Sequence, residues 1–156
     1  MRFDLKLIKD DESERILISL KSLYPRSFGN ILAVLDTGSS RTIISAQDVS
    51  LLNIPVNSFS KSDKPVSGFG RGSIPCKICN KFRMAIKSTE EKLKTFELPV
   101  HIVDTPALKK LNNEFQNRAY QIPTIVGLDF LKELDLSLFV NFNQGIAYLE
   151  ENNPQE

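Results

Sequence analysis

The sequence predicts a mainly β fold with one or two short helices. Most apolar residues occur in runs that alternate with polar residues, which is the spacing of a half-buried strand. Short clusters of Gly, Pro, Asn, Asp and Ser separate these runs, and such clusters form the turns between strands. Apolar residues at helical spacing occur only over short stretches. Together these observations make strands the main element of the fold.

Length and composition indicate one globular domain. The chain has 156 residues, which is enough to bury a hydrophobic core, and 41% of them are apolar while 25% are charged. We assign residues 1–150 to this domain and residues 151–156 to a polar, disordered tail.

Charge and hydropathy argue against two classes of partner. The formal net charge is +1 and the basic residues are scattered, so the chain lacks the basic patch of a nucleic-acid-binding protein. No stretch approaches the roughly 20 apolar residues of a membrane span. Residues 1–6 alternate polar and apolar residues, unlike a signal peptide. We therefore expect no nucleic-acid partner, no membrane partner and a cytoplasmic location.

The two cysteines, Cys76 and Cys79, have the spacing of half a zinc knuckle or of a redox pair. A structural zinc ion needs a full set of ligands, and His101 is the only histidine. Residues three apart in a strand point to opposite faces, which argues against a shared ligand role. We expect two ordinary residues in a reducing compartment, no metal, no cofactor, and a half-exposed His101 without a catalytic role.

The first part of the chain predicts a hairpin followed by a buried strand. Residues 2–8 and 16–20 alternate polar and apolar residues on either side of a polar turn at 9–13. A loop at residues 24–30 then leads into the apolar run 31–35, which indicates a buried strand.

A short helix is expected next. Ser45 has the residue type of an N-cap, and Asp48 follows three residues later, as in a capping box. Val49, Leu51 and Leu52 would form the buried face of this helix.

The rest of the chain continues the β pattern. Alternation predicts strands at residues 76–87, 96–103, 136–142 and 146–149, and helical spacing predicts short helices from Pro106 to about Asn117 and at about 128–134.

One carboxylate stands at an unusual place. Asp36 follows the last residue of the apolar strand, where an unpaired carboxylate is costly to remove from water. Gly38 permits the tight backbone geometry that would hold this side chain in a fixed direction. The hydroxyls of Thr37, Ser39 and Ser40 can donate hydrogen bonds to it or to the neighbouring backbone. The alternative is an ordinary turn, because Asp and Gly are both common turn formers.

Two further motifs follow. Glycines alternate at Gly68, Gly70 and Gly72, which suits a hairpin tip or a backbone that approaches a ligand closely. The spacing differs from the phosphate-binding fingerprint and no amphipathic helix follows, so a nucleotide site is not expected. Residues 125–127 form an apolar-apolar-Gly turn before the predicted helix at 128–134.

The order of these three motifs resembles that of the retropepsin-like aspartic peptidases, the single-domain family that includes the retroviral proteases. The resemblance covers residues 15–149. It implies one lobe of the acid-protease fold, that is, a small closed antiparallel β-barrel with a short C-terminal helix. It also implies hydrolysis of peptide bonds without a metal or cofactor.

The resemblance gives each motif a role. Asp36 would be the catalytic aspartate, with Thr37 bracing the paired loops across a dimer and Gly38 shaping the turn. The substrate would contact Ser39 and a flap that contains Gly68, Phe69 and Gly70, and the active-site loop would be supported by Ile125, Val126 and Gly127.

Two features depart from the viral members of the family. Ser39 stands where they usually have Ala, and its hydroxyl can hydrogen bond to the ionised Asp36 carboxylate and favour the charged form. Residues 88–120 form a longer segment than the viral members need. This segment is expected to add strands, or a helix near the substrate cleft.

The chemistry requires two chains. Hydrolysis by carboxylates needs one group to take a proton from water and another to donate a proton to the carbonyl oxygen, and two neighbouring aspartates share a proton. The chain carries one Asp-Thr-Gly, at Asp36. We therefore expect a homodimer in which the two Asp36 side chains face each other about a two-fold axis. Residues 2–8 and 146–150 are the candidate strands for joining the copies.

The leading interpretation is thus a homodimeric aspartic endopeptidase that acts on a peptide or protein substrate through a water held between the two Asp36 carboxylates. The alternative is a non-catalytic retropepsin-fold module for dimerisation or peptide binding. A third interpretation is a globular β domain in which Asp-Thr-Gly occurs by chance and Asp36 lies on an exposed turn.

Overall fold

The computed structural model describes residues 1–62 and 73–152. Its strands are β1 Arg2–Asp4, β2 Lys6–Lys9, β3 Glu14–Ser22, β4 Gly29–Leu35, β5 Ile43–Ile44, β6 Ser60–Lys61, β7 Cys76–Lys87, β8 Leu93–Val103, β9 Ile125–Val126, β10 Leu136–Asn141 and β11 Ile146–Glu151. Its helices are α1 Ala46–Leu51, α2 Thr105–Leu108, α3 Asn113–Gln121 and α4 Leu128–Glu133, with a 3-10 turn η1 at Val56–Ser58. The prediction of a mainly β fold is confirmed.

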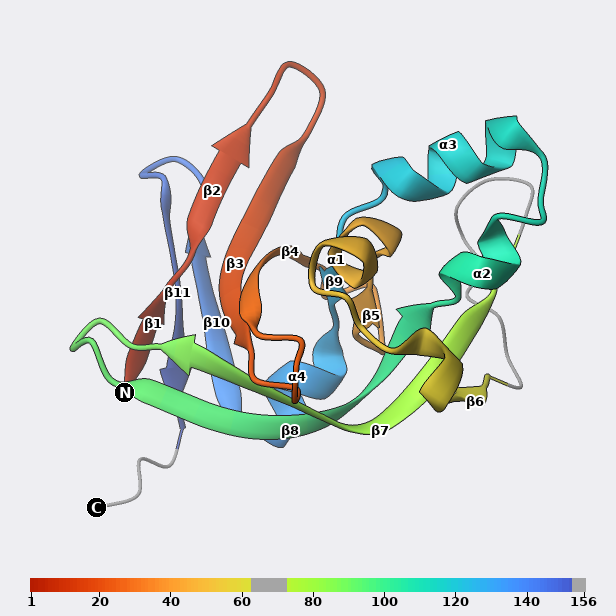
Figure 1. Cartoon of the computed structure of the whole chain (residues 1–156). Helices are drawn as coiled ribbons and strands as arrows, with labels where there is room; N and C mark the ends of the chain where they lie inside the picture. The colour runs from red at the N-terminus through yellow and green to blue at the C-terminus, as the bar shows by residue number, and fades with distance from the viewer. Residues whose placement is uncertain (63–72, 153–156) are drawn as a thin grey trace.

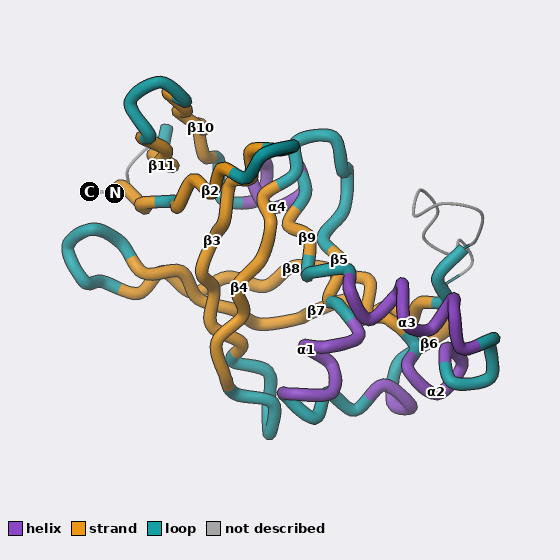
Figure 2. The backbone as a smooth tube through the Cα atoms, turned by 90° about the horizontal axis from the view of Figure 1, so that it is seen from above, coloured by secondary structure: helices purple, strands orange, loops and turns teal. Residues whose placement is uncertain are grey.

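The strands form two sheets (Figure 1). The smaller sheet has the order β1-β11-β10 and brings strands from both ends of the chain together. The larger sheet runs β2-β3-β4-β9-β5-β8-β7-β6, and an additional pairing of β3 with β7 closes it into a ring. Helices α1, α2 and α3 lie together on the side of the molecule away from the smaller sheet, as the view from above also shows (Figure 2).

The architecture differs in two ways from the sequence prediction, which was a closed antiparallel barrel with one or two short helices. The ring contains two parallel pairs, β4 with β9 and β5 with β8, because the chain reaches these partners by long crossovers and not by hairpins. The described residues also form four α-helices. Helix α2 and all but the last residue of α3 lie in the long segment 88–120.

Strand β4 is buried on one face only, contrary to the buried strand expected from the apolar run 31–35. Ile31, Ala33 and Leu35 are buried, whereas Leu32 is 61% exposed. Side chains alternate along a strand, so β4 turns one face toward the core and the other toward solvent.

The N-cap of α1 is as predicted, because the Ser45 hydroxyl oxygen accepts a hydrogen bond from the backbone N–H of Asp48 at 3.1 Å. The buried face of the helix is narrower than predicted. Val49 is buried, but Leu51 is 76% exposed. Two positions along a helix amount to just over half a turn, so Leu51 points away from the core that Val49 faces.

The helix predicted from Pro106 to about Asn117 is divided into α2 and α3. Asn112 starts the second helix by accepting a hydrogen bond from the N–H of Phe115 at 2.8 Å, and Asp104 caps the first in the same way. These short polar side chains begin helices more readily than they continue them. No helix among the described residues has the length and apolar composition needed to cross a membrane.

The two cysteines are buried in different parts of the core. Cys79 belongs to the main core, while Cys76 packs in a smaller cluster that includes Ile74, Val103 and Leu108. Among residues 1–62 and 73–152, no group of three His, Cys, Asp or Glu side chains is arranged to hold a metal ion.

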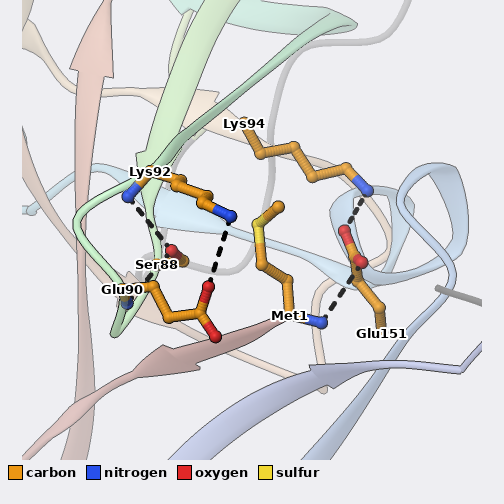
Figure 3. Close-up of polar contacts among 6 residues, drawn as sticks. All are labelled: Met1, Ser88, Glu90, Lys92, Lys94 and Glu151. Atoms are coloured by element: carbon orange, nitrogen blue, oxygen red, sulfur yellow. Dashed lines mark hydrogen bonds and ion pairs between the residues drawn. The ribbon is translucent and has the colours of Figure 1, made fainter. Parts of the chain in front are cut away.

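Hydrogen bonds tie the end of β11 to the rest of the domain. The Glu151 carboxylate accepts a hydrogen bond from the Lys94 ammonium of β8 (Figure 3). The backbone N–H of Asn152 donates to the Asp135 carbonyl at 3.1 Å. Glu151, the first residue of the assigned tail, is therefore the last residue of β11, and Asn152 is hydrogen-bonded to Asp135 just before β10.

Candidate active site

Asp36 lies directly after β4, in an exposed turn. Its Oδ1 atom accepts a hydrogen bond from the backbone N–H of Gly38 at 2.8 Å, and its carbonyl oxygen accepts one from the N–H of Ser39 at 3.1 Å. These two bonds fix the turn and the direction of the carboxylate. Thr37 is exposed in the same turn. The structure thus presents Asp36, Thr37 and Gly38 together at the surface of one chain.

Strand β9 holds this turn from the side. It pairs in parallel with the end of β4, Val34 with Ile125 and Leu35 with Val126. The N–H of Asp36 continues the ladder by donating to the Val126 carbonyl at 2.9 Å. On its other side β9 pairs with β5. It therefore lies between the two strands that the Asp36 turn connects.

Gly127 makes the closest contact with the turn. A Cβ atom at this position would lie 2.7 Å from the carbonyl oxygens of both Ser39 and Arg41. The next N–H, from Leu128, donates to the Ser39 carbonyl at 2.8 Å. Such an approach requires glycine, so the motif at residues 125–127 lies against the loop that it was predicted to support.

A second set of contacts, which the sequence did not predict, also fixes the turn. The Asp129 carboxylate of α4 accepts two hydrogen bonds from Thr42, one from its N–H and one from its hydroxyl, each at 2.9 Å. The Thr42 hydroxyl oxygen in turn accepts a hydrogen bond from the N–H of Gly127 at 3.3 Å. In the sequence, Asp129 is marked only by its place in the first turn of a predicted helix, which does not point to Thr42.

Ser39 makes a different contact from the one expected. Its hydroxyl donates to the backbone carbonyl of Arg41 at 2.8 Å and not to the carboxylate of Asp36. The hydroxyl has a single proton to donate. The expected hydrogen bond from Ser39 to the Asp36 carboxylate is therefore wrong for this arrangement.

His101 is buried and not half-exposed, with an exposed fraction of 6%. The parallel pairing of β5 with β8 sets it opposite Ile43, and its Nε2 atom lies 3.2 Å from Nη1 of Arg41. A guanidinium can only donate, so Nε2 accepts and the imidazole is neutral. Burial and then the Arg41 charge lower the pKa of His101, against a smaller raising effect of Asp129.

Two open clefts adjoin these residues. One of about 340 Å³ is lined by Asp36 and by side chains that include Arg15, Arg118, Val34 and Ile125. The other, also of about 340 Å³, is lined by Arg41, His101 and Asp129 among others. No motif in the sequence marks Arg15 or Arg118. The predicted flap with Gly68, Phe69 and Gly70 lies outside the described residues.

No protein-family model matches the sequence, and no curated protein matches it. Comparison of the coordinates with solved structures is more informative. The chain is similar to a retropepsin-like aspartic protease from Rickettsia conorii, with a TM-score of 0.59 and 10% sequence identity over 97% of this chain and 92% of that one. The fold is retropepsin-like.

Two further structures resemble this retropepsin-like chain. The structure of edgp matches with a TM-score of 0.53 and 10% identity over 98% of this chain but only 46% of that one, so the chain spans about half of edgp. EIAV protease, solved with the inhibitor HBY-793, matches with a TM-score of 0.49 and 15% identity over 85% of this chain and 100% of that one. At these identities the likeness concerns the fold, and the chemistry has to be argued from the residues.

Replacing Gly127 by Ala is expected to lower the free energy of unfolding by about 3 kcal/mol, because the added methyl group must displace two backbone carbonyls. Urea denaturation measures the loss. Gly145→Ala is the control: no atom lies within 4 Å of its added Cβ, and the left-handed backbone alone costs about 1 kcal/mol. Equal losses in the two variants would contradict the close contact.

Acidification is expected to destabilise the fold through His101. Its contribution is complete above the ordinary histidine pKa of 6.5 and decreases as pH falls below that value, because the unfolded chain then binds a proton that the folded chain binds less readily. His101→Gln should therefore lose less stability than the wild type between about pH 7 and pH 5. Urea denaturation at each pH tests this, and parallel curves of stability against pH would contradict it.

Glu151 does not interfere in this pH range. Its pKa is lowered chiefly by its hydrogen bond from Lys94, so its contribution to stability is lost only as the pH falls below 4.5.

Proposed function

We propose that the chain is a homodimeric aspartic endopeptidase in which Asp36 is the catalytic residue. The observation that carries the proposal is the place of Asp36: an exposed carboxylate, directed by the Gly38 N–H at 2.8 Å, at the end of β4 in a retropepsin-like fold. Thr37 would brace the two loops across the dimer. Residues 125–127 hold the loop through the contacts described above.

One chain supplies half of the catalytic group. Asp36 is the only acidic residue among the described side chains that line its cleft. A second copy related by a two-fold axis would bring its own Asp36 to the same place. Two carboxylates within hydrogen-bonding distance share one proton, because both cannot be charged together, so one acts as a base while the other acts as an acid.

A water between the two Asp36 side chains would be the nucleophile. The ionised carboxylate takes a proton from this water as the water oxygen bonds to the scissile carbonyl carbon, and the protonated carboxyl donates its proton to the carbonyl oxygen. The tetrahedral intermediate then breaks its C–N bond. The leaving nitrogen takes a proton from one carboxyl, and a hydroxyl of the intermediate returns a proton to the other. The products are an acid and an amine, and the pair is again singly protonated, without a metal or cofactor.

The predicted substrate contacts complete the proposal. Ser39 would lie beside the peptide, since it directly follows the catalytic tripeptide.

The terminal strands suggested by the sequence are already paired within one chain. The strand at residues 2–4 pairs with β11, and β2 pairs with β3. The outer side of β1 receives a hydrogen bond from the N–H of Thr89 to the Arg2 carbonyl at 2.9 Å. In contrast, the edge of β10 that faces away from β11 pairs with no described strand.

Strand β10 and the turn after it carry two exposed apolar side chains. Phe139 is 45% exposed and Phe142, in the turn that follows, is 51% exposed. An apolar edge strand is a template for pairing with another chain. We therefore propose that the two copies join along β10, which α4 alone separates from the strand that supports Asp36.

The alternative is a module that binds a peptide or dimerises without catalysis. The exposed turn at Asp36 is also what the third interpretation predicts, a globular β domain in which Asp-Thr-Gly occurs by chance. The Asp36→Asn experiment distinguishes catalysis from binding alone.

Asp36→Asn is expected to reduce kcat/KM by at least about a thousandfold, because an amide can neither take a proton from water nor share one with its mate. Cleavage of a peptide library, read by mass spectrometry, measures the loss. Asp11→Asn, in the exposed turn before β3, makes the same chemical change away from the cleft and should keep full activity. Undiminished cleavage by the Asp36 variant would exclude the mechanism, and peptide binding without any cleavage by the wild type would favour the module.

A double Phe139→Lys, Phe142→Lys variant is expected to weaken dimerisation by about tenfold or more, because charges on an edge strand oppose pairing. Phe28→Lys is the matched control, since Phe28 is 68% exposed in the loop before β4. Analytical ultracentrifugation measures the dissociation constants. A wild type that remains monomeric at every concentration would contradict the homodimer, and an unaltered double variant would contradict the β10 interface.

A further inference from the structure

The cleft beside Asp36 is also lined by an arginine. Strands β3 and β4 pair antiparallel with Leu17 opposite Val34. Arg15 and Asp36 each lie two residues beyond this pair, at the same end of the two strands. Cross-strand neighbours point to the same face of a sheet, and both side chains line the same cleft of about 340 Å³.

A second arginine lines this cleft from α3. Arg118 contributes to the lining together with Gln121, which lies one helical turn away. The Arg118 guanidinium pairs with the Glu114 carboxylate at 2.8 Å, and the two side chains are 63% and 79% exposed. So exposed a pair contributes little to stability, and it leaves the positive charge available to a bound anion.

The charge of Arg15 has no ion-pair partner among the described residues. It acts on Asp10 from a greater distance. The Asp10 carboxylate is already held by the backbone N–H groups of Glu12 and Ser13, at 3.1 and 2.7 Å. The described lining of the cleft therefore sets two guanidinium groups against the single carboxylate of Asp36.

The rest of the lining is largely apolar and includes Val34, Ile122 and Ile125. An aliphatic stem that ends in an anion suits this combination, and a glutamate side chain has that form. Guanidinium groups bind carboxylates through paired hydrogen bonds. We infer that the substrate is a peptide with an acidic side chain, glutamate in preference, next to the scissile bond, and that Arg15 and Arg118 bind it. This inference rests on the proposed peptidase function and gives its substrate class.

The test compares pairs of peptides that differ only by Glu or Gln, with the varied position moved one residue at a time across a cleaved bond. The wild type is expected to cleave the best Glu peptide with a kcat/KM about tenfold above that of its Gln partner. This preference should shrink at high salt, because exposed charges are screened. The ratio is the readout, because Arg15 lies beside Asp36 and its loss alters the rate on both peptides.

Arg15→Gln and Arg118→Gln should each lower the Glu-to-Gln ratio, and the double variant should bring it close to one. Arg83→Gln is the control. It removes the same charge from an exposed residue of β7 whose neighbour Met84 pairs with Ser22, at the opposite end of β3 from Arg15. A ratio that is the same in the wild type and the double variant would overturn the inference. Arg15→Glu should favour a Lys peptide over its Gln partner, and its failure to do so would count equally against Arg15.

The experiment distinguishes a failure of this inference from a failure of the proposed peptidase function. Cleavage with a Glu-to-Gln ratio near one at low salt would overturn the acidic preference and leave the peptidase intact. If no peptide is cleaved, fluorescence anisotropy with the same labelled peptides and the Asp36→Asn variant decides the question. Binding of the Glu peptide about tenfold more tightly than the Gln peptide would support the preference, and equal binding would overturn it.

Discussion

The insertion of the two-residue strand β9 between β4 and β5 is the constraint on which the candidate site depends. The Asp36 turn leaves the ring on β4 and returns on β5, so β9 sets the distance that the turn must span. Gly127 then approaches the carbonyls of Ser39 and Arg41 more closely than any side chain permits. Most of these contacts come from backbone atoms. Such a scaffold tolerates wide changes of side chain, in keeping with 10% identity to a structure of the same fold.

Two polar side chains near the turn, Thr42 and Ser39, bond to groups other than the Asp36 carboxylate. Thr42 gives its N–H and its hydroxyl to Asp129, and Ser39 gives its hydroxyl to the backbone. The Asp36 carboxylate has one donor among the described residues, the N–H of Gly38. The remaining acceptor sites of this carboxylate are therefore open to the partner chain that the proposal requires.

The local pattern of residues predicted the helices and strands. The features that were missed depend on how strands far apart in the sequence pair with each other. The Asp36 turn, the Ser45 cap and the glycine at 127 are marked by neighbours along the chain. The burial of His101 is not, because it comes from the parallel pairing of β8 with β5, far earlier in the sequence. Strand β8 is buried at four successive residues, 100–103, so alternation gives no guide there. Arg15 was missed for a related reason: it reaches the Asp36 cleft only because β3 pairs with β4.

Joining two copies at Asp36, as proposed, would bring two like charges together. Two carboxylates about 4 Å apart repel by about 1 kcal/mol in water and several times more in a closed cleft. A proton shared between the two side chains would remove one of the charges. Arg15 lines the same cleft and makes no ion pair among the described residues. In this proposal its guanidinium is therefore available to an acidic peptide, so substrate selection and catalysis would take place in one cleft but depend on different side chains.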